Sequence, residues 1–131
     1  MASIVAAIPA VRAALLSLQR QFAAQPPHGS GAILDGRDIG TVVLPHADIK
    51  FFIDADIDIR AERRTKELIQ AGQSVMFRDV LTEMQERDNR DRSRTVAPLR
   101  PADDAITIDT SKMDADAVLA LAQSHIAALS G

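Results

Sequence analysis

The sequence predicts an α/β fold in which helices flank a parallel sheet. A continuous apolar run at residues 49–53 is typical of a parallel strand that is covered on both faces. Two segments with helical periodicity follow it, over residues 57–71 and 75–91, and a second apolar strand pattern lies at residues 105–108. Because parallel strands are joined by right-handed helical crossovers, this order indicates a layered α/β domain.

The remaining elements follow from local signals. Pro9 is a favourable first helical residue, and apolar side chains recur behind it at helical spacing. Residues 25–31 form a loop by composition, and residues 32–34 read as a further short strand. The segment 95–102 contains two prolines and is expected to be a loop.

Capping residues predict where two of the helices begin and end. Asp56 precedes the helix expected at residues 57–71, and Gly72 follows it as a stop signal. Asp114 precedes a last helix that is expected to end near residue 129.

Composition narrows the class of protein. The chain has 131 residues, which predicts one domain (1–131) with room for a substantial core. A net charge of -3 and the absence of Trp and Tyr argue against nucleic-acid binding. The absence of Cys excludes disulfides and thiolate metal sites, and it fits a reducing cytoplasm.

The sequence gives no sign of a membrane segment or a metal site. No apolar run approaches the ~20 residues that span a bilayer, and we expect neither a signal peptide nor a membrane partner. The three histidines (His28, His46 and His125) are far apart and lack metal-ligand spacing, so no protein metal site is expected.

An arginine-rich segment at residues 86–97 carries the strongest functional signal. Arg87, Arg90, Asp91 and Arg94 share one helical face. Guanidinium forks grip phosphate and carboxylate oxygens in pairs, so this face suits a phosphorylated sugar. The alternative is a solvated helix tip with local ion pairs such as Glu83 to Arg87.

A second candidate site is the turn of Asp35, Gly36, Arg37 and Asp38, which follows the strand expected at residues 32–34. Ligands bind at the carboxyl ends of strands in open α/β sheets. Arg37 is then a phosphate clamp, and Asp38 is an acceptor for an exocyclic amine. The alternative is a tight turn with a local ion pair.

Other arginines are open to two interpretations. Arg60, Arg63 and Arg64 form a basic patch on the helix at residues 57–71, and the alternative is a solvated face paired to Asp56 and Glu67. Arg12 lies beside the apolar stripe of the first helix, where arginines usually extend along the surface. No G-x-x-x-x-G-K-[ST] phosphate loop occurs in the sequence.

Four segments together resemble bacterial cytidylate kinases. They are SIVAAIPAVRAAL (3–15), DGRDIGTVVLPHA (35–47), ERDNRDRSRTVAPL (86–99) and ITIDTS (106–111). The resemblance implies a three-layer fold like that of the P-loop NTPases. It also implies a nucleoside monophosphate kinase that transfers the ATP γ-phosphate, with Mg²⁺, to the small molecules CMP or dCMP.

The resemblance also implies roles for particular residues. Ser3, Arg12 and Asp38 would read the cytosine, and Arg37 and Arg94 would bind and position the transferred phosphate. Arg87 and Asp91 would contact the sugar, with Asp35 in the same turn as Arg37. Arg60, Arg63 and Arg64 would belong to a lid, within residues 57–95, that closes over the ATP phosphates.

Family members begin with a strand and a phosphate loop that have no counterpart here. The resemblance implies that this first, central strand would lie between the strands expected at residues 32–34 and 49–53. We therefore expect the C-terminal part of a cytoplasmic, monomeric enzyme, which is inactive alone. The alternatives are a non-catalytic nucleotide-binding or partner-binding remnant, including a partner of a separate phosphate-loop half, and an interaction protein for an acidic partner.

Overall fold

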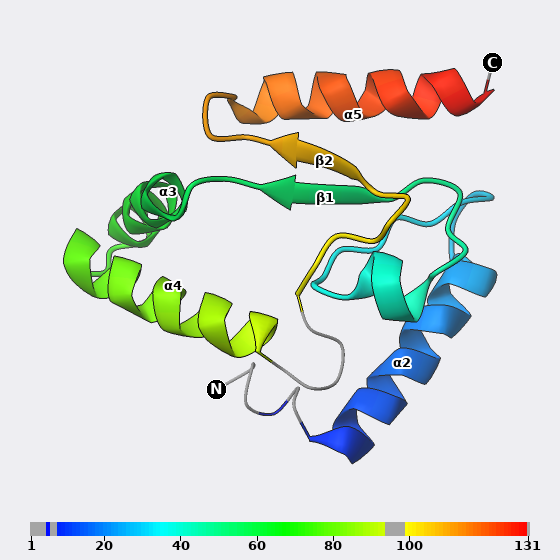
Figure 1. Cartoon of the computed structure of the whole chain (residues 1–131), viewed down its shortest axis with the longest axis horizontal. Coiled ribbons are helices and arrows are strands. Elements are labelled where there is room, and N and C mark those ends of the chain that lie inside the picture. Colours follow the sequence, from blue (N-terminus) through cyan, green and yellow to red (C-terminus); the bar gives the residue numbers. More distant parts are fainter. Residues whose placement is uncertain (1–4, 6–7, 94–98, 131) are drawn as a thin grey trace.

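The computed structural model describes residues 5, 8–93 and 99–130. Four α-helices, a short π-helix and two strands follow one another along these residues (Figure 1). In chain order they are α2 (Pro9–Ala24), η1 (Ile39–Val43), β1 (Phe51–Asp54), α3 (Ile57–Gln70), α4 (Phe77–Arg92), β2 (Ile106–Asp109) and α5 (Ala115–Ser130).

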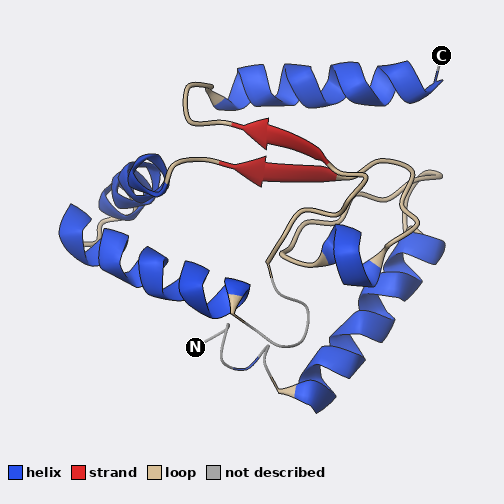
Figure 2. Ribbon diagram, viewed as in Figure 1, coloured by secondary structure: helices blue, strands red, loops and turns tan. Residues whose placement is uncertain are grey.

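The two strands form a small parallel sheet (Figure 2), which confirms an α/β fold. The register pairs Phe51 with Ile106 and Asp54 with Asp109, and helices α3 and α4 form the connection between the strands. Helix α5 runs along the sheet (Figure 1), where the His125 and Phe51 rings meet edge to face at 6.1 Å.

The expected helix ends are confirmed in two of three cases. Gly72 adopts the left-handed conformation (φ +85°) after α3, as its role as a stop signal requires. The Ala117 N–H donates to Asp114 Oδ1 at 2.8 Å, so Asp114 caps α5. The expected side-chain cap by Asp56 is wrong, because Asp56 forms no such bond; its own N–H donates to Ser111 Oγ at 2.9 Å.

The strand expected at residues 32–34 is also wrong. These residues have no regular secondary structure, and the Ile33 side chain lies in solvent, with 91% of the residue exposed. A strand needs a neighbour to pair its backbone groups, and among the described residues the sheet contains β1 and β2 alone. The predicted loop at residues 95–102 falls partly outside the described residues.

The π-helix η1 fixes the turn at residues 35–38 against α2. The Arg20 guanidinium on α2 donates to the carbonyl oxygens of Val42 and Val43, each at 3.0 Å. Gly40 packs on the Lys50 side chain, where an added Cβ would lie 3.2 Å from Lys50 Cδ. The turn is therefore held between α2 and the segment that enters β1.

The core is smaller than the chain length predicts. Among the described residues, the buried apolar ones are Val43, Ala55, Ala61, Val80 and Ile108. The chain exposes 9521 Å², whereas a compact monomer of this mass exposes roughly 6,700 Å². Exposed apolar side chains, including Leu18, Ile33 and Met76, account for part of this surface.

Candidate functional site

Helix α2 and the turn at residues 35–38 are joined by an ion pair. Arg12 Nη2 on α2 donates to Asp38 Oδ2 at 2.9 Å, and both side chains are about four-fifths buried, with 21% and 18% exposed. The structure thus brings together two of the three residues that were predicted to read a cytosine. It also shows that Arg12 points toward the turn rather than along the surface.

A second ion pair joins the same turn to α4. Arg37 Nε donates to Asp91 Oδ2, and the Asp91 side chain is only 3% exposed while that of Arg37 is 39% exposed. The partners are 54 residues apart in the sequence. Asp91 is therefore not part of a solvated helix tip, and Arg37 is not confined to an ion pair within its own turn.

The other residues predicted to bind the acceptor are less constrained. Asp35 is exposed and lines a cavity beside the turn, and Arg87 is exposed on α4 one turn before Asp91. Ser3 and Arg94 lie outside the described residues. The described part of the site is thus Arg12, Asp35, Arg37, Asp38, Arg87 and Asp91.

A cavity of about 470 Å³ separates the segment at residues 32–37 from β1. Residues 49–54 line its other side, and Arg60, Asp88 and Arg92 contribute to its wall. One edge of β1 pairs with β2, and none of the described residues forms a strand on its other edge. The predicted site and this edge are therefore neighbours.

The three arginines of the predicted lid have different surroundings. Arg63 Nη1 donates to Thr110 Oγ1 at 3.1 Å, and its Nη2 donates to Thr110 O at 2.6 Å and Met113 O at 3.2 Å. Arg64 pairs with Glu67 at 3.1 Å on the exposed face of α3, as the alternative interpretation predicts. Arg63 thus ties α3 to the end of β2, whereas Arg64 faces solvent.

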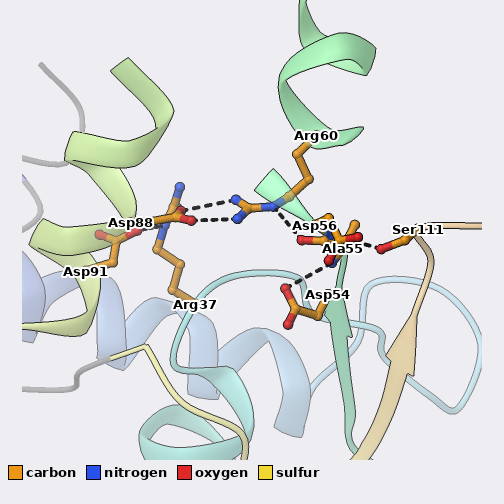
Figure 3. Close-up of polar contacts among 8 residues, drawn as sticks. All are labelled: Arg37, Asp54, Ala55, Asp56, Arg60, Asp88, Asp91 and Ser111. Carbon is orange, nitrogen blue, oxygen red and sulfur yellow. Dashed lines mark hydrogen bonds and ion pairs between the residues drawn. The ribbon is translucent and has the colours of Figure 1, made fainter. Parts of the chain in front are cut away.

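Arg60 crosses from α3 to α4 and grips Asp88 with both ends of its fork (Figure 3). Its Nη1 and Nη2 donate to Asp88 Oδ1 and Oδ2 at 3.1 and 2.6 Å, and its Nε donates to Ala55 O at 3.0 Å. The hydrogen bonds with Asp88 raise the pKa of Arg60, and the negative charges of Asp88 and Asp54 act in the same direction against desolvation. Arg60 pairs with Asp88 rather than Asp56.

The sequence predicts no role for Asp54, Asp88 and Arg92, although the last two belong to the arginine-rich segment at residues 86–97. Asp54 ends β1, and Asp88 and Arg92 lie on α4 beside the same cavity. One signal was present for Asp88, which precedes Asp91 by three residues and so shares its helical face. Nothing local indicates that Arg60 is its partner.

Two negative findings concern the described residues. Within them, no group of three or more His, Cys, Asp and Glu side chains is arranged to hold a metal ion. None of the helices found there has both the length and the apolar character that a bilayer crossing requires.

The fold and the site together indicate a protein that binds a small anionic molecule. Two arginine–carboxylate pairs meet at the turn of residues 35–38, and Asp35 and Arg37 of that turn line the cavity beside β1. Such a set suits a small molecule that carries an anionic group and a polar ring, as nucleotides do.

The comparisons with known proteins place the chain in one family. Residues 1–128 match the cytidylate kinase family, and the chain belongs to it. Over 121 residues it is 59% identical to the cytidylate kinase of Paramagnetospirillum magneticum, and these residues make up 92% of this chain and 57% of the relative. Over 127 residues it is 54% identical to the cytidylate kinase of Rhodospirillum rubrum, and these residues make up 96% of this chain and 60% of the relative. A third relative, the cytidylate kinase of Aliivibrio salmonicida, is 53% identical over 125 residues. The chain thus spans little more than half the length of these relatives.

Proposed function

We propose that the chain carries the acceptor site for CMP or dCMP in an enzyme that transfers the ATP γ-phosphate to them. The two ion pairs, Arg12 with Asp38 and Arg37 with Asp91, carry this proposal. They gather residues from α2, from the turn at residues 35–38 and from α4, and these are residues to which the resemblance gives acceptor-binding roles.

The geometry supports a division of labour among these side chains. Asp38 accepts a hydrogen bond from the exocyclic amine of cytosine, and Arg12 holds the Asp38 carboxylate in place. Arg37 and Arg94 bind the monophosphate, whereas Arg87 and Asp91 contact the sugar; Ser3 belongs to the base-reading set. The reaction needs no protein nucleophile, because phosphoryl transfer depends on positioning and on neutralising charge.

The donor ATP and its Mg²⁺ are assigned to the complete enzyme. The described residues present no acidic cluster for a metal, and the sequence contains no phosphate loop with its lysine. The described residues therefore do not fit Mg²⁺. Arg60, Arg63 and Arg64 remain proposed lid residues, within a lid at 57–95, that approach the ATP phosphates.

We also propose that a strand from the remaining family sequence fills the gap between residues 32–34 and β1. This placement is supported by the cavity there, by the exposed Ile33 and by the edge of β1 that no described strand pairs. Such a strand would complete the sheet of a three-layer fold like that of the P-loop NTPases. We expect the complete enzyme to be monomeric and cytoplasmic.

The same open edge favours a second candidate function. An unpaired sheet edge recruits extended polypeptide from another chain, so the protein is alternatively a binding module for a partner that supplies the phosphate loop. Mixing the chain with the N-terminal segment of a relative tests the partner role. CMP phosphorylation by the mixture supports the partner role, and no association between the two polypeptides argues against it.

The acceptor site is tested by phosphorus NMR of CMP titrated with the chain and with two variants. Arg37→Ala should weaken CMP binding by roughly 1.5–3 kcal/mol, the scale of a charge-assisted hydrogen bond. Arg78→Ala removes an exposed arginine from the first turn of α4 and is the matched control, which should bind as the parent does. Equal affinity in all three proteins would refute the phosphate-clamp role of Arg37.

A further inference from the structure

The Arg60–Asp88 pair stands between two cavities. Arg60 and Asp88, together with Asp54 and Arg92, line the cavity beside β1 and also a second, more open cavity at the carboxyl end of that strand. The side chains of Arg60 and Asp88 are 27% and 14% exposed, so the pair is reachable from solvent but mostly covered. In Figure 3 the pair bridges α3 and α4 above the end of β1.

The pair also shares a helix turn with the acceptor site. Asp88 and Asp91 lie three residues apart on α4, and each carboxylate holds one arginine from a distant element. Arg37 comes from the acceptor turn and Arg60 comes from α3 (Figure 3). Helix α4 therefore binds Arg37 of the acceptor turn through Asp91 and Arg60 of α3 through Asp88.

The chemistry of the Arg60 fork allows an exchange of partners. A guanidinium binds a carboxylate and a phosphoryl group through the same pair of parallel N–H bonds, so one can replace the other without moving the arginine backbone. The Asp88 carboxylate accepts from Nη1 and Nη2 of Arg60, and the Ala55 carbonyl accepts from its Nε. Arg92 adds positive charge at the same cavity. The Asp54 carboxylate accepts a hydrogen bond from the Ala55 N–H at 2.9 Å.

We propose that Asp88 is a placeholder for a phosphoryl group on Arg60. A polyphosphate anion that enters the open cavity beside Arg92 displaces the Asp88 carboxylate from the fork and so loosens α3 from α4. The proposal rests on the proposed assignment of Arg60 to the donor phosphates.

The test is a calorimetric titration with inorganic tripolyphosphate. Asp88→Asn removes the competing charge and should tighten binding about tenfold, because the anion no longer has to break a charge-assisted pair. Glu62→Gln is the matched control, since it removes one negative charge from an exposed site on α3 two residues from Arg60. Equal affinities for the two variants, or weaker binding by Asp88→Asn, would overturn the proposal.

A second measurement covers the case in which Asp88→Asn does not fold. In the unaltered chain, carboxyl ¹³C NMR should show the Asp88 resonance moving as tripolyphosphate is added, with the Glu62 resonance unchanged. A static Asp88 resonance at saturation would contradict the proposal. CMP is titrated separately: loss of CMP binding with an intact tripolyphosphate response would reject the acceptor site but not the exchange at Arg60.

Discussion

The ion pair between Arg37 and Asp91 should couple the acceptor turn to α4 strongly enough to measure. Breaking a fully buried pair costs roughly 3–5 kcal/mol, whereas an exposed pair contributes at most about 1 kcal/mol. Asp91 is 3% exposed and Arg37 is 39% exposed, so this pair lies between the two limits. We expect Arg37→Ala to lower the free energy of unfolding by about 2 kcal/mol, because the Asp91 carboxylate is then left buried without its partner.

The assay is a double-mutant cycle of Arg37→Ala and Asp91→Asn, followed by urea unfolding. The chain has no Trp or Tyr, so far-UV circular dichroism is the appropriate signal. The exposed Arg64–Glu67 pair on α3 serves as the control cycle, with an expected coupling below about 0.5 kcal/mol. A coupling energy for Arg37 and Asp91 no larger than that of the control would refute the reasoning.

Three further predictions concern specificity, acid stability and the end of α3. Asp38→Ala should reduce the preference for CMP over UMP if Asp38 reads the exocyclic amine; calorimetry that shows the same preference in both proteins would rule that out. The hydrogen bond from Lys50 lowers the pKa of Asp104, so the stability it provides is present above the ordinary aspartate pKa of about 3.9 and is lost as the pH falls through the lowered value. The free energies of unfolding of the parent and of Asp104→Asn should therefore differ near neutral pH and converge at low pH. A difference that does not depend on pH would contradict this. Gly72→Ala should destabilise the chain by about 1–2 kcal/mol in thermal unfolding because φ is +85°, whereas Gly31→Ala should change stability by less than about 0.5 kcal/mol; equal effects would show that the left-handed turn is not needed.

Elements with a strong local pattern were predictable from the sequence. The apolar runs at residues 49–53 and 105–108 correspond to β1 and β2, each displaced by one or two residues. The helices expected at 57–71 and 75–91 correspond to α3 and α4, since helical periodicity and end signals depend only on nearby residues.

Features that depend on distant partners were not predictable in this way. The apolar residues 32–34 have the composition of a strand but lack a neighbour with which to pair. The π-helix η1 leaves no clear signal in residues 39–43, and it is fixed by Arg20 from another helix. Long-range pairing, which local patterns do not encode, decides both cases.

The candidate site residues were chosen from the sequence, but the bonds between them were not predicted. The resemblance assigned Arg12 and Asp38 to the base, and the structure joins them directly. Arg37 and Asp91 were assigned to the phosphate and the sugar, yet they form one ion pair. No sequence pattern predicts the bond between Arg60 and Asp88, because residues 28 positions apart give no spacing signal.

The central claim is that this chain holds a CMP-selective acceptor site, and calorimetric titration of the purified chain tests it most directly. CMP, UMP and AMP are titrated under the same conditions. The account predicts saturable CMP binding and weaker binding of UMP, since the Asp38 carboxylate, held by Arg12, accepts a hydrogen bond from the cytosine amine. Weaker binding of AMP is also expected. Equal affinity for all three, or no binding of CMP, would contradict it.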